Sequence, residues 1–314
     1  MWFKSASLFQ FLIQFKTKPE ELEEMLQEHT FSHVNNRQLH SYGWVPPLGG
    51  DSEQLVHTSS GFLLLKARRE ERILPSSVIA EHMAERIQQL EEKLDRKIRG
   101  KEKLDIRDNV VMELTPQAFT KSTYEQILIM PQQNLLVVDN TSDKKIDQCT
   151  TLLREAMGNL PIAPIATEIG QSALFTRWLK GTRKLPKDFQ MGDECVLQDE
   201  DNVAGTVKCN KQDLTSDEIR ALSTSGKQVI KMALESNETV SFLLDEAFGF
   251  SKIKFLDTAP DDGSDTADLD PRAVFDGNFT LMALEFATLF PRVIELFGGL
   301  KEEGSENTSP EDAE

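Results

Sequence analysis

One amphipathic stretch, between Lys66 and Arg107, limits what this chain can fold into more than any other. Its apolar residues recur every three or four positions, and at 100° per residue they fall on one stripe. They are Ile79, Met83, Ile87, Leu90, Leu94 and Ile98. The spacing predicts a helix over residues 77–99, preceded by Pro75, that buries this stripe against a partner.

The basic residues of this stretch are arranged unevenly around the predicted helix. The stretch holds 12 of the 35 Lys and Arg residues of a chain whose net charge is -17. Arg86, Lys93 and Lys97 lie within about 40° of one another along the edge of the stripe, with no acidic residue three or four positions away. Other basic residues find acids four positions earlier, Arg96 with Glu92 and Arg99 with Asp95. The unpaired row is either a solvated face or a surface whose counter-charge comes from a partner.

Length and composition are those of a globular protein. A chain of 314 residues, 39% of them apolar, can bury a real core and has room for two or three subdomains. We expect no membrane partner, because no apolar run approaches the roughly 20 residues that a membrane span needs. The start of the sequence does not resemble a secretory signal. Three cysteines in no disulfide or zinc spacing indicate reduced thiols in a cytoplasmic protein.

The chain alternates strand-like, hairpin-like and helical segments without strict βαβ order, which predicts an α+β fold with antiparallel sheets and long helices. The expected strands are 7–15, 31–40, 55–59, 62–68, 127–130, 135–139, 195–198, 203–208, 229–234, 240–245 and 253–256. The expected helices, besides 77–99, are 19–29, 102–118, 142–157, one through 174–179, one from 215, and a last strand and helix within 279–296. Residues 43–50 read as a rigid loop anchored by Trp44.

We divide the chain into four parts on this pattern. These are an N-terminal α+β part (1–75), a long helical pair that forms an arm or tip (76–122), a second α+β part with C-terminal strands and a helix (123–300), and an acidic disordered tail (301–314).

Recognisable chemistry is scarce. The sequence lacks a Walker A loop, a dinucleotide-binding glycine motif and a nucleophile elbow. His29 and His33 span a predicted helix end, which makes a poor metal site. The aspartates from Asp261 lack the final glutamate of a calcium loop, where Arg272 stands. We therefore predict a binding protein with no catalytic residue, metal or cofactor, and leave open a metal-dependent hydrolase or nuclease built from scattered acids.

A net charge of -17 argues against a generic nucleic-acid binder, but the acid is unevenly placed. Residues 301–314 carry six acids and one base, and residues 257–276 carry seven aspartates against one arginine. A local basic groove is therefore compatible with the composition. Residues 180–187 carry four basic residues and no acid, which is typical of a solvated loop.

Several motifs spread over nearly the whole chain resemble one known family, the recombination-associated protein RdgC of proteobacteria. They are Trp2-Phe3-Lys4, Gly43-Trp44-Val45-Pro46-Pro47, the run from Ala67 to Ser76 with Ile73-Leu74-Pro75, Ala118-Phe119, Leu160-Pro161 and the run from Lys211 to Ser216.

The resemblance implies a non-enzymatic, nucleoid-associated DNA-binding protein of the cytoplasm. Members bind double-stranded and single-stranded DNA with little sequence preference, and they restrain RecA-promoted strand exchange. The resemblance also implies several subdomains in a curved protomer that closes with a second copy as a ring-shaped dimer around duplex DNA. Composition and spacing alone do not indicate a ring.

By matching motif, the resemblance assigns DNA binding to Lys66, Arg68, Arg69 and Arg72 before Ile73, and to Lys211 and Gln212 in the Lys-Gln-Asp-Leu-Thr loop. We expect the unpaired row Arg86, Lys93 and Lys97 to bind DNA as well, together with the basic residues Lys101, Lys121 and Lys208. Phe119 is the expected contact in the homodimer, with an ordinary core aromatic as the alternative. An alternative function also stays open, in which the helical pair is a protein-interaction module whose cationic edge binds an acidic partner.

Overall fold

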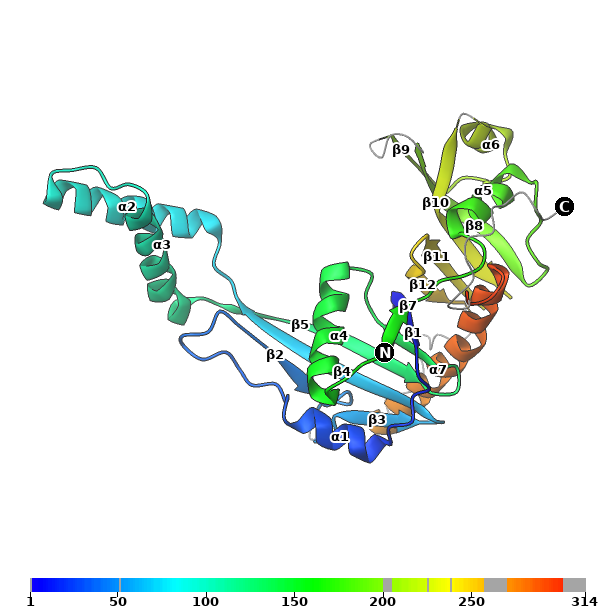
Figure 1. Cartoon of the computed structure of the whole chain (residues 1–314), viewed down its shortest axis with the longest axis horizontal. Helices are drawn as coiled ribbons and strands as arrows, with labels where there is room; N and C mark the ends of the chain where they lie inside the picture. Colours follow the sequence, from blue (N-terminus) through cyan, green and yellow to red (C-terminus); the bar gives the residue numbers. More distant parts are fainter. Residues whose placement is uncertain are drawn as a thin grey trace.

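A single antiparallel sheet organises the molecule (Figure 1). The structure is a computed structural model and describes residues 2–50, 52–199, 205–224, 226–237, 239–256 and 270–301. Within these residues 12 strands join in the order β2-β4-β5-β6-β1-β12-β11-β10-β8-β9, with β3 beside β4 and β7 beside β1. The α+β class with antiparallel pairing is therefore confirmed.

The elements have the following bounds. The strands are β1 (Ala6–Phe11), β2 (His40–Val45), β3 (Val56–Ser59), β4 (Phe62–Arg72), β5 (Thr120–Met130), β6 (Leu135–Val138), β7 (Ile162–Pro164), β8 (Phe189–Asp199), β9 (Thr206–Asn210), β10 (Lys227–Ser236), β11 (Val240–Asp245) and β12 (Gly249–Phe255). The helices are α1 (Pro19–Gln27), α2 (Ser76–Leu94), α3 (Lys101–Leu114), the 3-10 turn η1 (Thr115–Gln117), α4 (Asp143–Met157), α5 (Gln171–Lys180), α6 (Asp217–Thr224) and α7 (Pro271–Leu296).

Strand β1 joins the two halves of the sheet. It pairs with β6 over four residues, but it pairs with β12 only at Ala6 and Ser7. The Ser5 hydroxyl donates a 3.1 Å hydrogen bond to Asp139 Oδ1 beside this joint. Burial raises the pKa of Asp139 to about 6, although bonds from Ser5 oppose that shift. The joint therefore combines a short strand pairing with a buried polar anchor.

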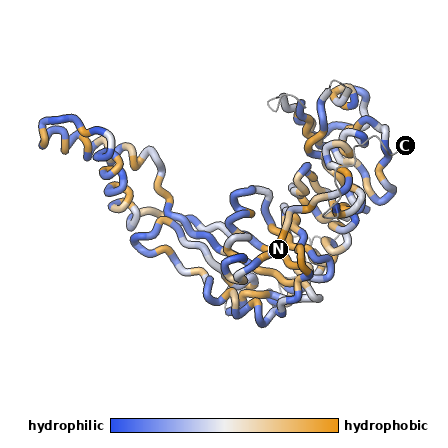
Figure 2. The backbone as a smooth tube through the Cα atoms, in the orientation of Figure 1, coloured by the Kyte–Doolittle hydropathy of each residue, from blue (hydrophilic) through white to orange (hydrophobic). Residues whose placement is uncertain are grey.

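Two large hydrophobic cores lie on opposite faces of the sheet. Alternation along β1 sends Ala6 and Leu8 into one core and Phe9 and Phe11 into the other, as expected for a strand covered on both faces. The first core is closed by α5, α6 and α7 and the second by α1 and α4. Figure 2 shows apolar residues concentrated in the strands of this central region.

Helices α2 and α3 form an arm that projects from one end of the sheet (Figure 1). The predicted stripe packs here as a third, small core around Ile98, Ile106 and Val110. The strands around β8 and β10, with α5 and α6, rise at the opposite end, so the chain is curved (Figure 1). The division of the chain into four parts stays a prediction, and its acidic tail lies outside the described residues beyond Lys301.

The predicted helix over residues 77–99 is shorter than expected. Helix α2 ends at Leu94, because Asp95 adopts a left-handed conformation with φ of 52°. Ile98 is still buried, since the turn folds it back and its N–H donates to Glu91 Oε1 at 2.8 Å. The last residue of the apolar stripe is therefore buried by the turn after α2 and not by the helix itself.

Other boundaries also differ from the prediction: β4, β5 and β8 are longer than the strands expected there, β1 is shorter, and the second strand and the last segment differ in kind. The second strand is β2, which starts at His40 and takes in the first residues of the expected rigid loop, although Trp44 is the buried anchor that we expected. The last segment, residues 279–296, lies entirely within one helix, α7, so the strand expected there is not formed. Pro271 at its first turn supplies a helix start that the apolar run from Phe279 did not indicate.

Gly43 gives a test of the β2 packing. A Cβ atom at this position would lie 2.6 Å from Phe31 Cα and N, so Gly43→Ala must push these backbones apart. We expect a loss of about 1–3 kcal/mol in the free energy of unfolding, measured by urea denaturation. Gly277→Ala is the matched control, because open space surrounds Gly277 within α7 and alanine favours a helix by about 0.5–1 kcal/mol. Equal stabilities for the two variants would contradict the close packing.

Candidate nucleic-acid interface

The four basic residues predicted on β4 do not share one face of the sheet. The pairing of β4 with β5 places Lys66 opposite Gln126 and Arg68 opposite Tyr124, and Arg72 lies on this same face by alternation. Arg69 points to the other face, together with Lys121 of β5, which pairs with Glu71. The predicted group is thus split into a Lys66 face and an Arg69 face.

On the Lys66 face, two cations rest on aromatic rings. Lys66 Nζ lies 5.0 Å from the ring centroid of Tyr124, and Arg68 Cζ lies 4.5 Å from that of Phe31. Such contacts are favourable and keep the charge available to a ligand. Burial lowers the pKa of Lys66. Among the described residues, Lys66 has no carboxylate at ion-pair distance, and the Tyr124 ring is half-exposed beside it.

Glu70 fixes Arg68 from within the sheet. Its buried carboxylate accepts hydrogen bonds from Val34 N–H at 3.0 Å and from Arg68 Nη2 at 3.1 Å, and it lies 2.9 Å from His33 Nδ1. Burial raises the pKa of Glu70, but the hydrogen bonds from Val34 and His33 and the charges of His33 and Arg68 outweigh it, so the pKa lies below its ordinary value. The Arg68 guanidinium also donates to Ser122 Oγ at 3.0 Å. Arg68 is therefore held in one place.

Arg72 and Arg69 have structural partners. Arg72 Nη1 donates to the carbonyl oxygen of Ala118 at 2.9 Å, which ties the end of β4 to the return from the arm. Arg69 forms an ion pair with Glu71 on the face that carries α4. Both guanidinium groups are thus less available to an outside ligand than Lys66.

The cationic row predicted on α2 does not exist as one unpaired row. Arg86 Nη2 bonds Glu113 Oε2 at 2.8 Å, because α3 folds back alongside α2. Lys97 lies beyond the helix end, in the turn to α3, while Lys93 is in the last turn of α2. Lys101 begins α3, and all three lysines are exposed. The prediction that Arg86 is unpaired is wrong.

The ion pairs predicted within α2 are also wrong. Arg96 bonds Glu102 through two contacts of 2.6 and 2.9 Å rather than Glu92. Because the helix ends at Leu94, Arg99 and Asp95 are not one helical turn apart. The turn between α2 and α3, drawn as hydrophilic in Figure 2, is held by the ion pair of Arg96 with Glu102, which helical spacing could not reveal.

Phe119 is not a core residue. Its side chain is 84% exposed, between η1 and β5, where the arm returns to the sheet. Its carbonyl oxygen accepts a 2.8 Å hydrogen bond from Ile73 N–H, and the Ile73 side chain is 48% exposed. The base of the arm therefore presents two apolar side chains to solvent, and the core alternative for Phe119 is excluded.

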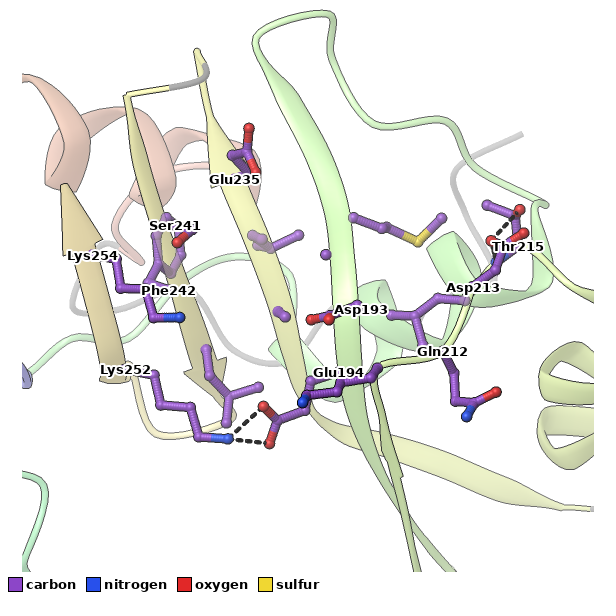
Figure 3. Close-up of a pocket in the computed structure, with 17 residues that line it drawn as sticks. Asp193, Glu194, Gln212, Asp213, Thr215, Glu235, Ser241, Phe242, Lys252 and Lys254 are labelled. Atoms are coloured by element: carbon purple, nitrogen blue, oxygen red, sulfur yellow. Dashed lines mark hydrogen bonds and ion pairs between the residues drawn. The ribbon is translucent and has the colours of Figure 1, made fainter. Parts of the chain in front are cut away.

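Lys211 and Gln212 lie at the other end of the molecule, on a groove of about 800 Å³ (Figure 3). Between two paired positions, β8 has three residues, starting with Gly192, where β10 has only Ala233. Such a bulge bends the strand. Gln212 N–H donates to the carbonyl oxygen of Asp193 in the bulge at 3.1 Å. The bulge therefore fixes the loop that carries Lys211, and Lys208 is exposed on β9 nearby in the chain.

The groove also contains two lysines that we did not predict. Lys252 Nζ lies 2.7 Å from Glu194 Oε1 in an ion pair across the groove (Figure 3). Lys254 is exposed on the same strand, and within the described part of the chain it has no acidic partner. The alternation Lys-Ile-Lys, with Ile253 buried, could have indicated two lysines on one face of a strand.

The structure brings the predicted basic residues together in three separate places. They are the arm with Arg86, Lys93, Lys97 and Lys101, the paired strands β4 and β5 with Lys66, Arg68, Arg69, Arg72 and Lys121, and the far end with Lys208, Lys211 and Gln212. The curvature of the chain places the first and third groups at opposite ends (Figure 1). Sequence reasoning also missed Tyr124 and Phe31.

The described residues contain neither a metal-binding cluster nor a helix suited to a membrane. No group of three or more His, Cys, Asp or Glu side chains among them could hold a metal ion. No helix in the described part of the chain combines the length and apolar character needed to cross a bilayer.

The fold and the site define an α+β protein with one long antiparallel sheet, whose strands extend beyond the hydrophobic cores and carry basic residues there. A family model described as "Putative exonuclease, RdgC" matches residues 1–300. The chain belongs to the RdgC family.

Three relatives share the name "Recombination-associated protein RdgC". That of Tolumonas auensis is 35% identical over 303 residues, which are 96% of this chain and 100% of that protein. That of Shewanella sediminis is 35% identical over 302 residues, 96% of this chain and 99% of that protein. That of Pseudomonas aeruginosa strain PAO1 is 34% identical over 300 residues, 95% of this chain and 98% of that protein. The family is thus one associated with recombination.

Glu70 should make stability depend on pH. Its lowered pKa means that its contribution is complete above the unfolded-state pKa of about 4.3 and is lost as pH falls through the lower folded-state pKa. Glu70→Gln should cost about 1–3 kcal/mol at pH 7 and should flatten this acid-side loss, as measured by urea unfolding from pH 7 to pH 3. Glu24→Gln on the exposed side of α1 is the control. An unchanged acid-side slope in Glu70→Gln would refute the assigned role.

Proposed function

We propose that this chain is a non-enzymatic DNA-binding protein that contacts the phosphate backbone and does not read base sequence. The observation that carries the proposal is the pair Lys66 and Arg68, which rest on the Tyr124 and Phe31 rings. Arg68 forms an ion pair with Glu70, whereas Lys66 has no acidic partner among the described residues. Fixed cations bind phosphates and release counterions, which gives affinity without sequence information. This mechanism suits a protein whose acidic surfaces repel DNA elsewhere.

The same face supports binding of both duplex and single-stranded DNA. A half-exposed ring such as Tyr124 between cations can stack an unpaired base while lysines neutralise the backbone. Lys93, Lys97 and Lys101 on the arm, and Lys208, Lys211 and Gln212 at the far end, would extend the contact along the curve of the chain. Lys252 and Lys254 would join the last group.

We further propose that two copies close as a ring-shaped homodimer that encircles duplex DNA. The curved arrangement of arm, sheet and far end supports this assembly (Figure 1). The exposed side chains of Phe119 and Ile73 at the base of the arm supply an apolar surface of the kind that interfaces bury. A closed ring would retain DNA topologically as well as electrostatically.

Occupation of DNA by such a ring would restrain RecA-promoted strand exchange without chemistry on the DNA. The names of the relatives, which associate them with recombination, support this role. The protein would then reside on the nucleoid in the cytoplasm.

The first test compares DNA affinity across a salt series. In Lys66→Gln/Arg68→Gln, the slope of log affinity against log salt should fall by about two per protomer, because each lost phosphate contact removes about 0.9. Fluorescence anisotropy with two unrelated duplexes and one single strand measures this slope, and the loss should be equal for both duplexes.

The control for that test is Lys16→Gln/Arg154→Gln, which removes the same charge from exposed positions on other surfaces. Equal slopes for the two double variants would reject the Lys66 face as the interface. Salt-independent or absent DNA binding by the unaltered chain would favour the alternative of an acidic protein partner. Magnesium-dependent loss of the labelled DNA would overturn the non-enzymatic assignment.

The second test concerns assembly. Phe119→Ser should shift the protein from dimer to monomer in sedimentation velocity at micromolar concentration, because it removes an exposed aromatic anchor. Its melting temperature should stay near that of the unaltered chain, since Phe119 is 84% exposed. Met112→Ser, at a 70% exposed position on α3, is the matched control. A Phe119→Ser protein that remains fully dimeric would rule out this contact.

A further inference from the structure

A compact basic surface lies at the C-terminal end of α5, away from the candidate interface. It consists of Arg177, Lys180, Arg183 and Lys184, all of them exposed. Among the described residues none of these four side chains has an acidic partner. Four neighbouring cations without counter-charge repel one another, so on a chain of net charge -17 something should neutralise them.

A hollow beside this basic surface is lined by cations and polar residues. Arg177, Lys180 and Lys227 line a hollow of about 280 Å³ between α5 and β10, together with Thr176 and Gln228, and no acidic side chain of the described residues lines it. Lys227 itself bonds Asp199 Oδ1 at 2.5 Å, so the other two cations face the hollow unpaired. Arg220 of α6 approaches from the other side, next to Gly181.

The last described residues bring the C-terminal segment to α5. The Phe297 ring, just after α7, packs against Phe175 and Trp178 of α5 with centroid distances of 5.7 and 5.6 Å. Ile169 N–H donates to the Phe297 carbonyl oxygen at 2.9 Å, and Lys301 N–H donates to that of Ala166 at 2.9 Å. The described chain therefore ends, at Lys301, beside the segment that leads into α5.

The segment that follows can reach the basic surface. Helix α5 has 10 residues and is therefore about 15 Å long. An extended chain covers about 3.3 Å per residue, so the 13 residues from 302 to 314 exceed this distance more than twofold. They include six acidic residues and no basic one, and they lie beyond the part matched by the family.

We propose that the acidic segment 302–314 binds the basic surface of α5 within the same chain. Attachment beside α5 gives the acids an effective local concentration in the millimolar range, so even a weak ionic contact is occupied. The segment would thereby occupy a surface that could otherwise bind DNA or another polyanion outside the candidate interface. This inference does not depend on DNA binding.

The experiment observes the segment directly and contains no DNA. Ser309→Cys in the full chain gives one reactive thiol, because Cys149, Cys195 and Cys209 are buried. A fluorophore on Cys at this position should show a restricted anisotropy at low salt that is lost as NaCl rises to about 0.5 M, where charges are screened beyond about 4 Å. The restriction should be absent at all salt concentrations when Arg177, Lys180, Arg183 and Lys184 are replaced by Gln.

The matched control replaces four exposed cations elsewhere, Lys16, Lys103, Arg107 and Arg154, by Gln. It has the same net charge and should keep the salt-sensitive restriction. Equal loss in both fourfold variants, or an anisotropy of the original chain that ignores salt, would overturn the proposal. An anisotropy that rises with protein concentration would also overturn the proposal, since it would indicate that the segment binds another copy. Circular dichroism verifies that each variant is folded.

Discussion

The short pairing of β1 with its neighbours is the constraint on which the rest of the structure depends. The strand contributes to both large cores by simple alternation, and it is the joint between β6 and β12. On the β12 side this joint has only two paired residues of β1, which provide few backbone hydrogen bonds. The packing of Leu8 and Phe11 into opposite cores must therefore hold the two halves of the sheet together. The relative position of the two halves, and with it the curve of the chain, follows from this one strand.

The same sheet explains where the basic residues are. In β4 the residues from Phe62 to Leu65 are all buried, whereas those from Lys66 to Arg72 are mostly half-buried, with Ala67 and Glu70 buried between them. The strand thus continues past the edge of the hydrophobic cores, and β5 accompanies it. In this part of the strands, aromatic rings and the Glu70 carboxylate hold the basic side chains in place instead of core packing. The cations of the site therefore lie on the part of β4 that extends beyond the hydrophobic cores.

Periodicity predicted most helices and hairpins, because local patterns determine them. The β3–β4 turn, the α4 helix ending at Gly158 and the stripe of α2 are examples. Alternation alone could also have shown that Arg68 and Arg69 face opposite sides. Local patterns could not supply the register between strands that are far apart in the sequence. Tyr124 lies opposite Arg68 only because β5 pairs with β4, although the whole arm separates these strands in the chain. Likewise Glu113 reaches Arg86, and Glu102 reaches Arg96, only after α3 has folded back.

The small core of the arm has a consequence for the energetics of the molecule. Its three buried residues, Ile98, Ile106 and Val110, belong to neither large core, and two chain connections join the arm to the sheet. Local opening requires only the free energy of the contacts that it breaks. We therefore expect the arm to open as a separate cooperative unit, so that its amide protons exchange with solvent before those of β1, β5 and β6, which require global unfolding. A protein built in this way can release one end without dissolving its sheet.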